Sequence, residues 1–174
     1  MTHELVILDR DGVINVPAQD NDYVYRVKDF KLYSDVEIFF TELLKYDKKI
    51  AIATNQRGIA KNLYTGQDVE LLHEHMLSIC NLTHDDITLF YCPHEIDTCE
   101  CRKPKPGLLN SALSILGMEK DQAIFIGDKA SDRQAAENAG IEFINLNRDS
   151  LSTSKSEIKT LIECLPLILG LGHE

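Results

Sequence analysis

The sequence has no long hydrophobic run and too few basic residues to balance its acidic ones. A membrane-spanning helix needs about 20 consecutive apolar residues, so none is expected. Residues 1–4, Met-Thr-His-Glu, lack the basic segment and apolar stretch of a signal peptide. We therefore expect a soluble cytoplasmic protein that does not bind membranes.

The deficit of basic residues also bears on the partners. Eighteen Lys and Arg against 28 Asp and Glu give a net charge of -10, and such a chain repels nucleic acid. The 174 residues, 44% hydrophobic and 26% charged, suffice for one domain with a core and argue against disorder. We predict a single domain over residues 1–174 and a monomer.

Apolar runs alternate with segments of helical periodicity along the chain. The runs predict strands at 4–8, 50–53, 87–91, 123–126 and 142–146. The periodic segments predict helices at 36–46, 67–82, 108–116, 131–139 and about 154–170. The last helix rests on a capping-box pattern at 154–157 and a stripe formed by Ile158, Leu161, Ile162 and Leu165. Such alternation predicts an α/β fold, a doubly wound, Rossmann-like parallel sheet.

Polar residues stand where three of the predicted strands end. Asp9, Thr54 and Asp128 each follow an apolar run. In a doubly wound sheet, ligands bind beyond the carboxyl ends of the strands. Side chains from these distant positions should therefore converge at one edge of the sheet.

Asp9-Arg10-Asp11-Gly12 places two carboxylates directly after a strand. A lone Asp there is most often part of a turn or a helix cap. Two carboxylates before a glycine that permits a tight turn suit a hard divalent cation such as Mg²⁺. Together with Asp128 they favour metal-dependent phosphate chemistry.

A carboxylate can attack phosphorus and form an aspartyl-phosphate, provided that positive charge and hydroxyl donors stabilise the phosphate. Thr54 offers a hydroxyl at the second strand end, and Lys103 offers a cation in Arg102-Lys103-Pro104-Lys105. Taken alone, that basic run would be read as a solvated surface turn.

Four segments together resemble the four motifs of the haloacid-dehalogenase superfamily, in order and spacing: 9–13 (DRDGV), 54–56 (TNQ), 102–104 (RKP) and 127–129 (GDK). The resemblance covers about residues 4–148 and implies a fold without a separate cap domain, since no such domain fits between the motifs. It implies that Asp9 is the nucleophile and Asp11 the general acid and base.

The same resemblance assigns the supporting roles. Thr54 and Lys103 would hold the phosphate, and Mg²⁺ would bind Asp9, the backbone carbonyl of Asp11, and Asp128. Asp132 could support the site, but a first-turn helix residue is the more ordinary interpretation.

Three of the five cysteines lie within ten residues, next to a histidine: Cys92, His94, Cys99 and Cys101. Three thiolates and an imidazole make a closed tetrahedral set, typical of structural zinc. A disulfide or free thiols are the alternatives. The zinc loop, residues 92–101, would fix the direction of the basic run that follows. Cys80 and Cys164 are expected to be buried thiols.

A zinc loop before Arg-Lys-Pro-Lys resembles one branch of the superfamily, whose members act on heptose 1,7-bisphosphate or on histidinol phosphate. Pro106-Gly107 and Lys129 favour the heptose substrate. The resemblance then implies hydrolysis of the 7-phosphate of D-glycero-D-manno-heptose 1,7-bisphosphate in the synthesis of a lipopolysaccharide core precursor. The expected substrate-binding residues are Tyr23, Asn55, Gln56, Arg57, Arg102 and Lys129.

Two other functions stay open. One is hydrolysis of histidinol phosphate or of another sugar phosphate. The other is a non-catalytic, phospho-accepting binding module. Asp11 argues against the module, because an acid–base group beside Asp9 would hasten loss of the phosphate.

Overall fold

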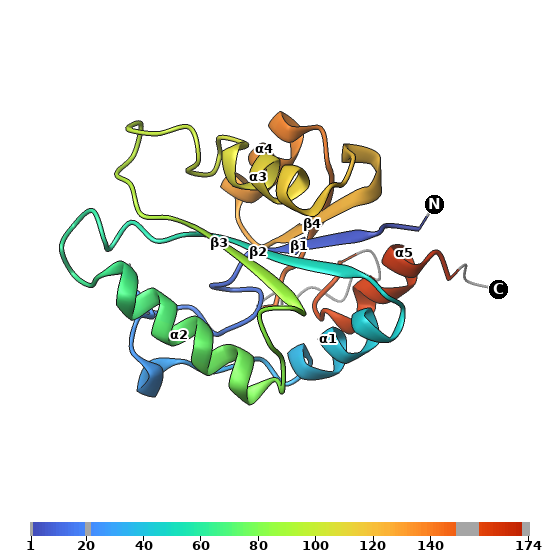
Figure 1. Ribbon diagram of the computed structural model, residues 1–174, viewed down its shortest axis with the longest axis horizontal. Coiled ribbons are helices and arrows are strands. Elements are labelled where there is room, and N and C mark those ends of the chain that lie inside the picture. The colour runs from blue at the N-terminus through green and yellow to red at the C-terminus, as the bar shows by residue number, and fades with distance from the viewer. Residues whose placement is uncertain (1, 20–21, 149–156, 172–174) are drawn as a thin grey trace.

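The computed structural model describes residues 2–19, 22–148 and 157–171. Five parallel strands form one sheet in the order β3-β2-β1-β4-β5 (Figure 1). The strands are β1 (Leu5–Leu8), β2 (Lys49–Asn55), β3 (Ile87–Cys92), β4 (Ala123–Gly127) and β5 (Glu142–Asn145). Each predicted strand is present within two residues of its expected bounds, and the predicted doubly wound α/β fold is confirmed.

Helices cover both faces of the sheet (Figure 1). One face carries α3 (Gly107–Leu116) and α4 (Ala130–Ala139), and the other carries α1 (Val36–Lys45), α2 (Gly66–Ile79) and α5 (Leu165–Leu169). Short 3-10 turns occupy Val27–Asp29, Lys120–Gln122 and Ile162–Cys164. The described residues add no further domain between the strands that carry the predicted motifs.

The two helical layers enclose two separate hydrophobic clusters. Along β1, Val6 and Leu8 pack with α1 and α2, whereas Leu5 and Ile7 pack with α3 and α4. Successive side chains of a strand point to opposite faces. All four residues of β1 are fully buried, which explains why the strand reads as an unbroken apolar run and not as an alternating one.

The predicted long C-terminal helix is wrong in its described part. Residues 149–156, including the start of the capping-box pattern, lie outside the described residues. Ile158 instead forms a β-bridge with Leu146, and α5 begins only at Leu165. Pro166 fits the first turn of α5, where its missing N–H costs nothing, but not the interior of a longer helix.

The apolar stripe behind that prediction nevertheless contacts the core. Leu161 is fully buried, and Ile158, Ile162 and Leu165 pack against the same cluster as α1. Among the described residues, no helix has both the length and the apolar character needed to cross a bilayer.

His73 on α2 gives the fold a specific sensitivity to acid. Its side chain is 3% exposed, and burial together with the positive charge of Arg10 lowers its pKa from 6.5 to about 3. Below pH 6.5, His73 therefore binds a proton in the unfolded chain and stays neutral in the native chain. Protonation favours the unfolded state, so the native state loses stability as the pH falls. We expect the free energy of unfolding to drop by about 2 kcal/mol between pH 7 and pH 5 because of this residue.

The variant His73→Leu tests this expectation. Urea unfolding at pH 7 and pH 5 should show that the variant lacks about 2 kcal/mol of the wild-type decline. An equal decline in both proteins would show that His73 does not cause it.

Candidate active site

The predicted residues from three strand ends lie together at the carboxyl edge of the sheet. Asp9 follows β1, Thr54 lies near the end of β2, and Asp128 follows β4. These three strands are neighbours in the sheet. They border a cleft of about 40 Å³, lined by Asp9, Asp11, Thr54, Asn55, Lys103, Lys129, Ser131 and Asp132.

Gly12 allows the loop after β1 to approach Asp128. Its φ angle is +100°, a conformation that other residues rarely adopt. A Cβ atom at this position would also lie 2.1 Å from Asp128 Oδ2. The glycine is therefore needed both for the turn and for the close packing of two acidic segments.

Lys103 is the buried cation of the cleft. Its side chain is 1% exposed, and its Nζ lies 2.8 Å from Asp9 Oδ1 and 2.7 Å from Asp132 Oδ1. Burial opposes the charge of Lys103, but the two carboxylates outweigh it and raise its pKa. Burial likewise opposes ionisation of Asp9, and the ammonium groups of Lys103 and Lys129 outweigh it, so the pKa of Asp9 is lowered. Asp9 is thereby held as a carboxylate.

Asp132 does more than the sequence suggests. One carboxylate oxygen, Oδ2, accepts a hydrogen bond from the backbone N–H of Lys129 at 3.1 Å, as a first-turn helix residue would. The other oxygen, Oδ1, pairs with Lys103. The contact with the Lys129 N–H is local and can be predicted from the sequence. The contact with Lys103 depends on the fold and cannot.

Asn55 fixes the backbone of Lys103. Its Nδ2 donates to the Lys103 carbonyl at 2.9 Å, and its Oδ1 accepts from the Lys103 N–H at 3.1 Å. Asn55 therefore uses its side-chain amide to join β2 to the segment that carries the buried cation.

Three oxygens converge on a single cationic group in this cleft. Lys129 Nζ lies 2.8 Å from the backbone carbonyl of Asp11, 3.4 Å from Asp9 Oδ2 and 3.5 Å from Asp128 Oδ1. Burial opposes the charge of Lys129, but the neighbouring carboxylates outweigh it and raise the pKa of Lys129. Burial raises the pKa of Asp128 to about 6. The same three residues are the predicted Mg²⁺ ligands, and oxygen donors around a positive charge fit such an ion.

Asp11 is held in place by three neighbouring side chains. Arg10 Nη2 donates to both carboxylate oxygens at 3.0 and 2.9 Å, Asn15 Nδ2 donates to Oδ1 at 2.9 Å, and Gln56 Nε2 donates to Oδ2 at 3.2 Å. Arg10 is fully buried and also donates to the carbonyl of Val24. Sequence reasoning missed Arg10 and Asn15 as members of the site, because their contacts depend on the path of the loop.

The other predicted binding residues lie in different surroundings. Gln56 is buried, and its side-chain amide forms internal hydrogen bonds to Asp11 and Thr54. Arg57 forms an ion pair with Glu95 of the 92–101 loop. Tyr23 packs edge-on against Tyr64, with ring centroids 5.7 Å apart. None of these three side chains lines the cleft.

Arg102 lines a second pocket beside the 92–101 loop. This pocket has a volume of about 200 Å³ and is lined by Ile96, Asp97, Cys99, Arg102, Lys103, Pro104 and Lys105. Lys103 borders both this pocket and the cleft.

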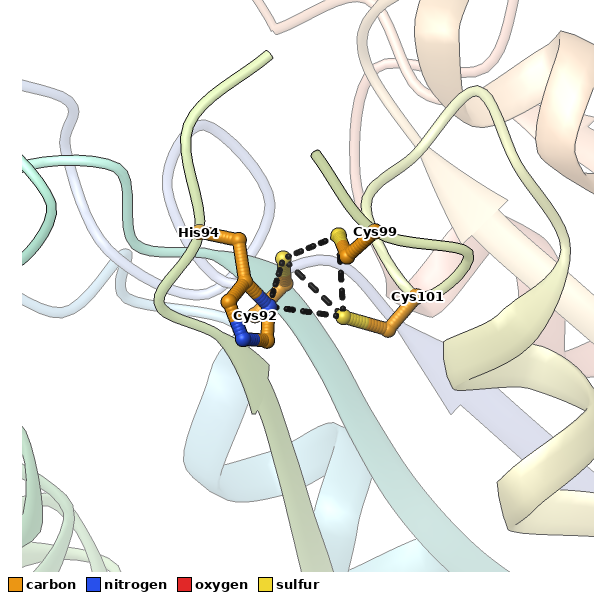
Figure 2. Close-up of side chains that lie close together, drawn as sticks. All are labelled: Cys92, His94, Cys99 and Cys101. Atoms are coloured by element: carbon orange, nitrogen blue, oxygen red, sulfur yellow. Dashed lines mark hydrogen bonds between the residues drawn. The ribbon is translucent and has the colours of Figure 1, made fainter. Parts of the chain in front are cut away.

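The predicted cysteine cluster is assembled at the end of β3 (Figure 2). Cys101 Sγ lies 3.2 Å from Cys92 Sγ, 3.3 Å from Cys99 Sγ and 3.2 Å from His94 Nδ1. The four donor atoms all lie within 4.8 Å of one another and could hold a metal ion. Sulfur ligands of a tetrahedral zinc ion, with bonds of about 2.3 Å, stand about 3.8 Å apart, close to this spacing.

The alternative of a disulfide in this cluster is wrong. All five cysteines are free, and a disulfide would bring two sulfurs to about 2.05 Å. Cys80 and Cys164 are buried, as predicted.

The fold and the cleft define a hydrolytic enzyme of the doubly wound α/β class, with an anionic carboxylate beside a buried lysine. The sequence model of the haloacid dehalogenase-like hydrolases matches residues 12–146. The chain belongs to this family, as the resemblance of its motifs implied.

The curated relatives carry more specific names. The chain is 39% identical to D-glycero-alpha-D-manno-heptose-1,7-bisphosphate 7-phosphatase of Campylobacter jejuni, over 81% of this chain and 80% of that protein. It is 36% identical to the D-glycero-beta-D-manno-heptose-1,7-bisphosphate 7-phosphatase of Escherichia coli K12, over 78% of this chain and 74% of that protein.

The fold is also similar to a solved structure with ligands. The D,D-heptose 1,7-bisphosphate phosphatase of B. bronchiseptica, complexed with magnesium and phosphate, superposes with a TM-score of 0.79 and 25% identity. The match covers 94% of this chain and 98% of the other.

Removing the charge of Lys103 should destabilise the protein strongly. In Lys103→Met, the carboxylates of Asp9 and Asp132 lose their buried partner, and breaking a buried ion pair costs about 3–5 kcal/mol. Urea unfolding without added metal would measure this loss. The control Lys45→Met, which breaks an exposed pair with Glu42, should cost less than about 1 kcal/mol. Equal, small losses in the two variants would contradict this assignment.

Proposed function

We propose that this protein is a Mg²⁺-dependent phosphatase that removes the 7-phosphate of D-glycero-D-manno-heptose 1,7-bisphosphate. The observation that carries the proposal is the position of the Asp9 carboxylate, 2.8 Å from Lys103 Nζ at the sheet edge. The names of the relatives from C. jejuni and E. coli support the choice of substrate. We treat residues 1–174 as one catalytic domain and expect a monomer.

In the first half of the reaction, an oxygen of Asp9 attacks the phosphorus atom. The bond between phosphorus and the C7 oxygen breaks, and its electrons go to that oxygen, which takes a proton from Asp11. Asp9 then carries the phosphoryl group as an acyl phosphate. Lys103 and Thr54 line the cleft, and their ammonium and hydroxyl groups would stabilise the charge on the phosphoryl oxygens.

In the second half, Asp11 takes a proton from a water molecule, which attacks the phosphorus of the acyl phosphate. The bond between phosphorus and the Asp9 oxygen breaks, so Asp9 is regenerated and inorganic phosphate leaves. The contacts from Arg10, Asn15 and Gln56 keep the Asp11 carboxylate in one position for both transfers.

The metal site fits this reaction. Asp9, the Asp11 carbonyl and Asp128 would hold Mg²⁺, whose chemistry is to neutralise charge on the transferring phosphoryl group. Lys129, which contacts these same oxygens, then lies close enough to bind the substrate. Arg102 faces the adjoining pocket and would contact the sugar or its second phosphate.

We propose that the cysteine cluster, formed by Cys92, His94, Cys99 and Cys101, binds a structural zinc ion. Four protein donors leave no position open for a substrate. Arg57 adds a second link to this loop through Glu95. Because Lys103 stands two residues after Cys101, the metal would fix the segment that supplies the buried cation. Reduced thiolates suit a cytoplasmic enzyme.

Phosphate release with Mg²⁺ tests the substrate. Both anomers of the heptose bisphosphate and histidinol phosphate should be compared side by side. We expect kcat/KM to be at least about a hundredfold higher for a heptose bisphosphate, equivalent to about 2.7 kcal/mol. Asp9→Asn should lose turnover, because its amide cannot form the acyl phosphate. The reverse preference would contradict the heptose assignment and favour histidinol phosphate.

The zinc proposal predicts one tightly bound zinc ion per chain, measured by elemental analysis of protein purified without chelator. Cys101→Ser should lower the zinc content and the melting temperature, because the ion links a loop with no core of its own. Cys80→Ser, outside the cluster, should leave the zinc content unchanged. A wild-type protein free of zinc, with a melting temperature insensitive to chelators, would contradict the proposal.

A further inference from the structure

Tyr64 is a buried tyrosine directly before Thr65, the N-cap of α2. The side chain is 5% exposed, and the hydroxyl donates to Gln56 Oε1 at 2.7 Å. Burial raises the pKa of Tyr64 well above its usual value. The hydroxyl therefore keeps its proton and stays a donor.

The Gln56 amide connects this hydroxyl to two residues of the cleft. Its Nε2 donates to Thr54 Oγ1 at 2.9 Å and to Asp11 Oδ2 at 3.2 Å. An amide nitrogen has two hydrogens, and both are used here. If the amide were reversed, its oxygen would face the Asp11 carboxylate, which is repulsive. The hydrogen bond from Tyr64 favours the productive orientation.

We infer that Tyr64 is a positioning residue that acts through Gln56 on Asp11 and Thr54. This inference rests on the proposed function, in which Asp11 transfers the proton and Thr54 holds the phosphate. Since Thr54 Oγ1 accepts from Gln56, its own hydroxyl hydrogen is free to donate to a phosphoryl oxygen. One tyrosine hydroxyl thus orients both the acid–base group and a phosphate donor.

The ring of Tyr64 is held firmly enough for this role. Tyr25 stacks on it with centroids 4.9 Å apart and planes 12° apart, and Tyr23 meets it edge-on. On the other side, a Cβ atom at Gly58 would lie 2.0 Å from the ring. Only a glycine there leaves room for this placement of the ring. The edge-on contact also couples Tyr64 to Tyr23, which the sequence predicts to bind substrate.

The variant Tyr64→Phe removes the hydroxyl and keeps the ring. With the heptose bisphosphate we expect kcat/KM to fall about tenfold, within the range for one lost hydrogen bond, and the melting temperature to fall by a few degrees, because Gln56 Oε1 loses a buried donor. With p-nitrophenyl phosphate, whose leaving group needs little help from an acid, the loss should be smaller. A merely structural role would lower both equally. Tyr46→Phe, at the exposed end of α1, serves as the control and should lose nothing.

A double-mutant comparison tests whether Tyr64 acts through Gln56. In the background of Gln56→Ala, adding Tyr64→Phe should change kcat/KM by less than about twofold, since coupled residues are not additive. Losses that multiply would overturn the inference. So would wild-type kcat/KM in the single variant.

A binding measurement separates this inference from the proposed function. Calorimetric titration with inorganic phosphate and Mg²⁺ should show weaker phosphate binding by Tyr64→Phe, about threefold or more, because the Thr54 hydroxyl is less well oriented. A wild-type protein without phosphatase activity would overturn the proposed function, and the phosphate affinities would still decide the positioning claim. Equal affinities in wild type and variant would overturn that claim.

Discussion

The ion pair of Lys103 with Asp9 and Asp132 is the interaction on which the site depends. A carboxylate can act as a nucleophile toward a phosphate only if it stays ionised in a buried cleft and its charge is offset. The ammonium of Lys103 bears on both needs, since its charge outweighs the burial of Asp9 and its side chain lines the same cleft. The same ion pair joins three parts of the chain: the end of β1 at Asp9, the segment after the cysteine cluster at Lys103, and the start of α4 at Asp132. The stability of the fold and the proposed chemistry therefore depend on one buried charge.

Several features of the chain serve to place that charge and its partners. Asn55 holds the backbone of Lys103 through two hydrogen bonds, and the cluster at the end of β3 stands just before it. Gly12 lets the acidic loop come close to Asp128. Arg10, fully buried under the same loop, fixes Asp11. Contacts from several strands and loops therefore act on a cleft of about 40 Å³, which explains how a site is organised although the described residues form no cap domain.

The parts of the structure set by local pattern could be predicted from the sequence, and the parts set by distant contacts could not. Strand ends at Asp9, Thr54 and Asp128 are visible as apolar runs that stop at polar residues, and the cluster spacing is visible within ten residues. The C-terminal helix was predicted wrongly because Ile158 pairs with Leu146 instead of continuing a helical stripe. Gln56 is predicted from the sequence to bind substrate, but its buried side chain forms hydrogen bonds with Tyr64 and Asp11. Nothing in the local sequence of Tyr64 signals that role.

The central claim is that Asp9 becomes phosphorylated during turnover. The most direct measurement is rapid acid quenching of the enzyme mixed with heptose 1,7-bisphosphate and Mg²⁺, followed by mass spectrometry of the peptide that contains Asp9. We predict a phosphorylated Asp9 in the first turnover, an adduct sensitive to hydroxylamine, and none in Asp9→Asn. Phosphate release at the full rate without this adduct, or with the phosphoryl group on another residue, would contradict the account.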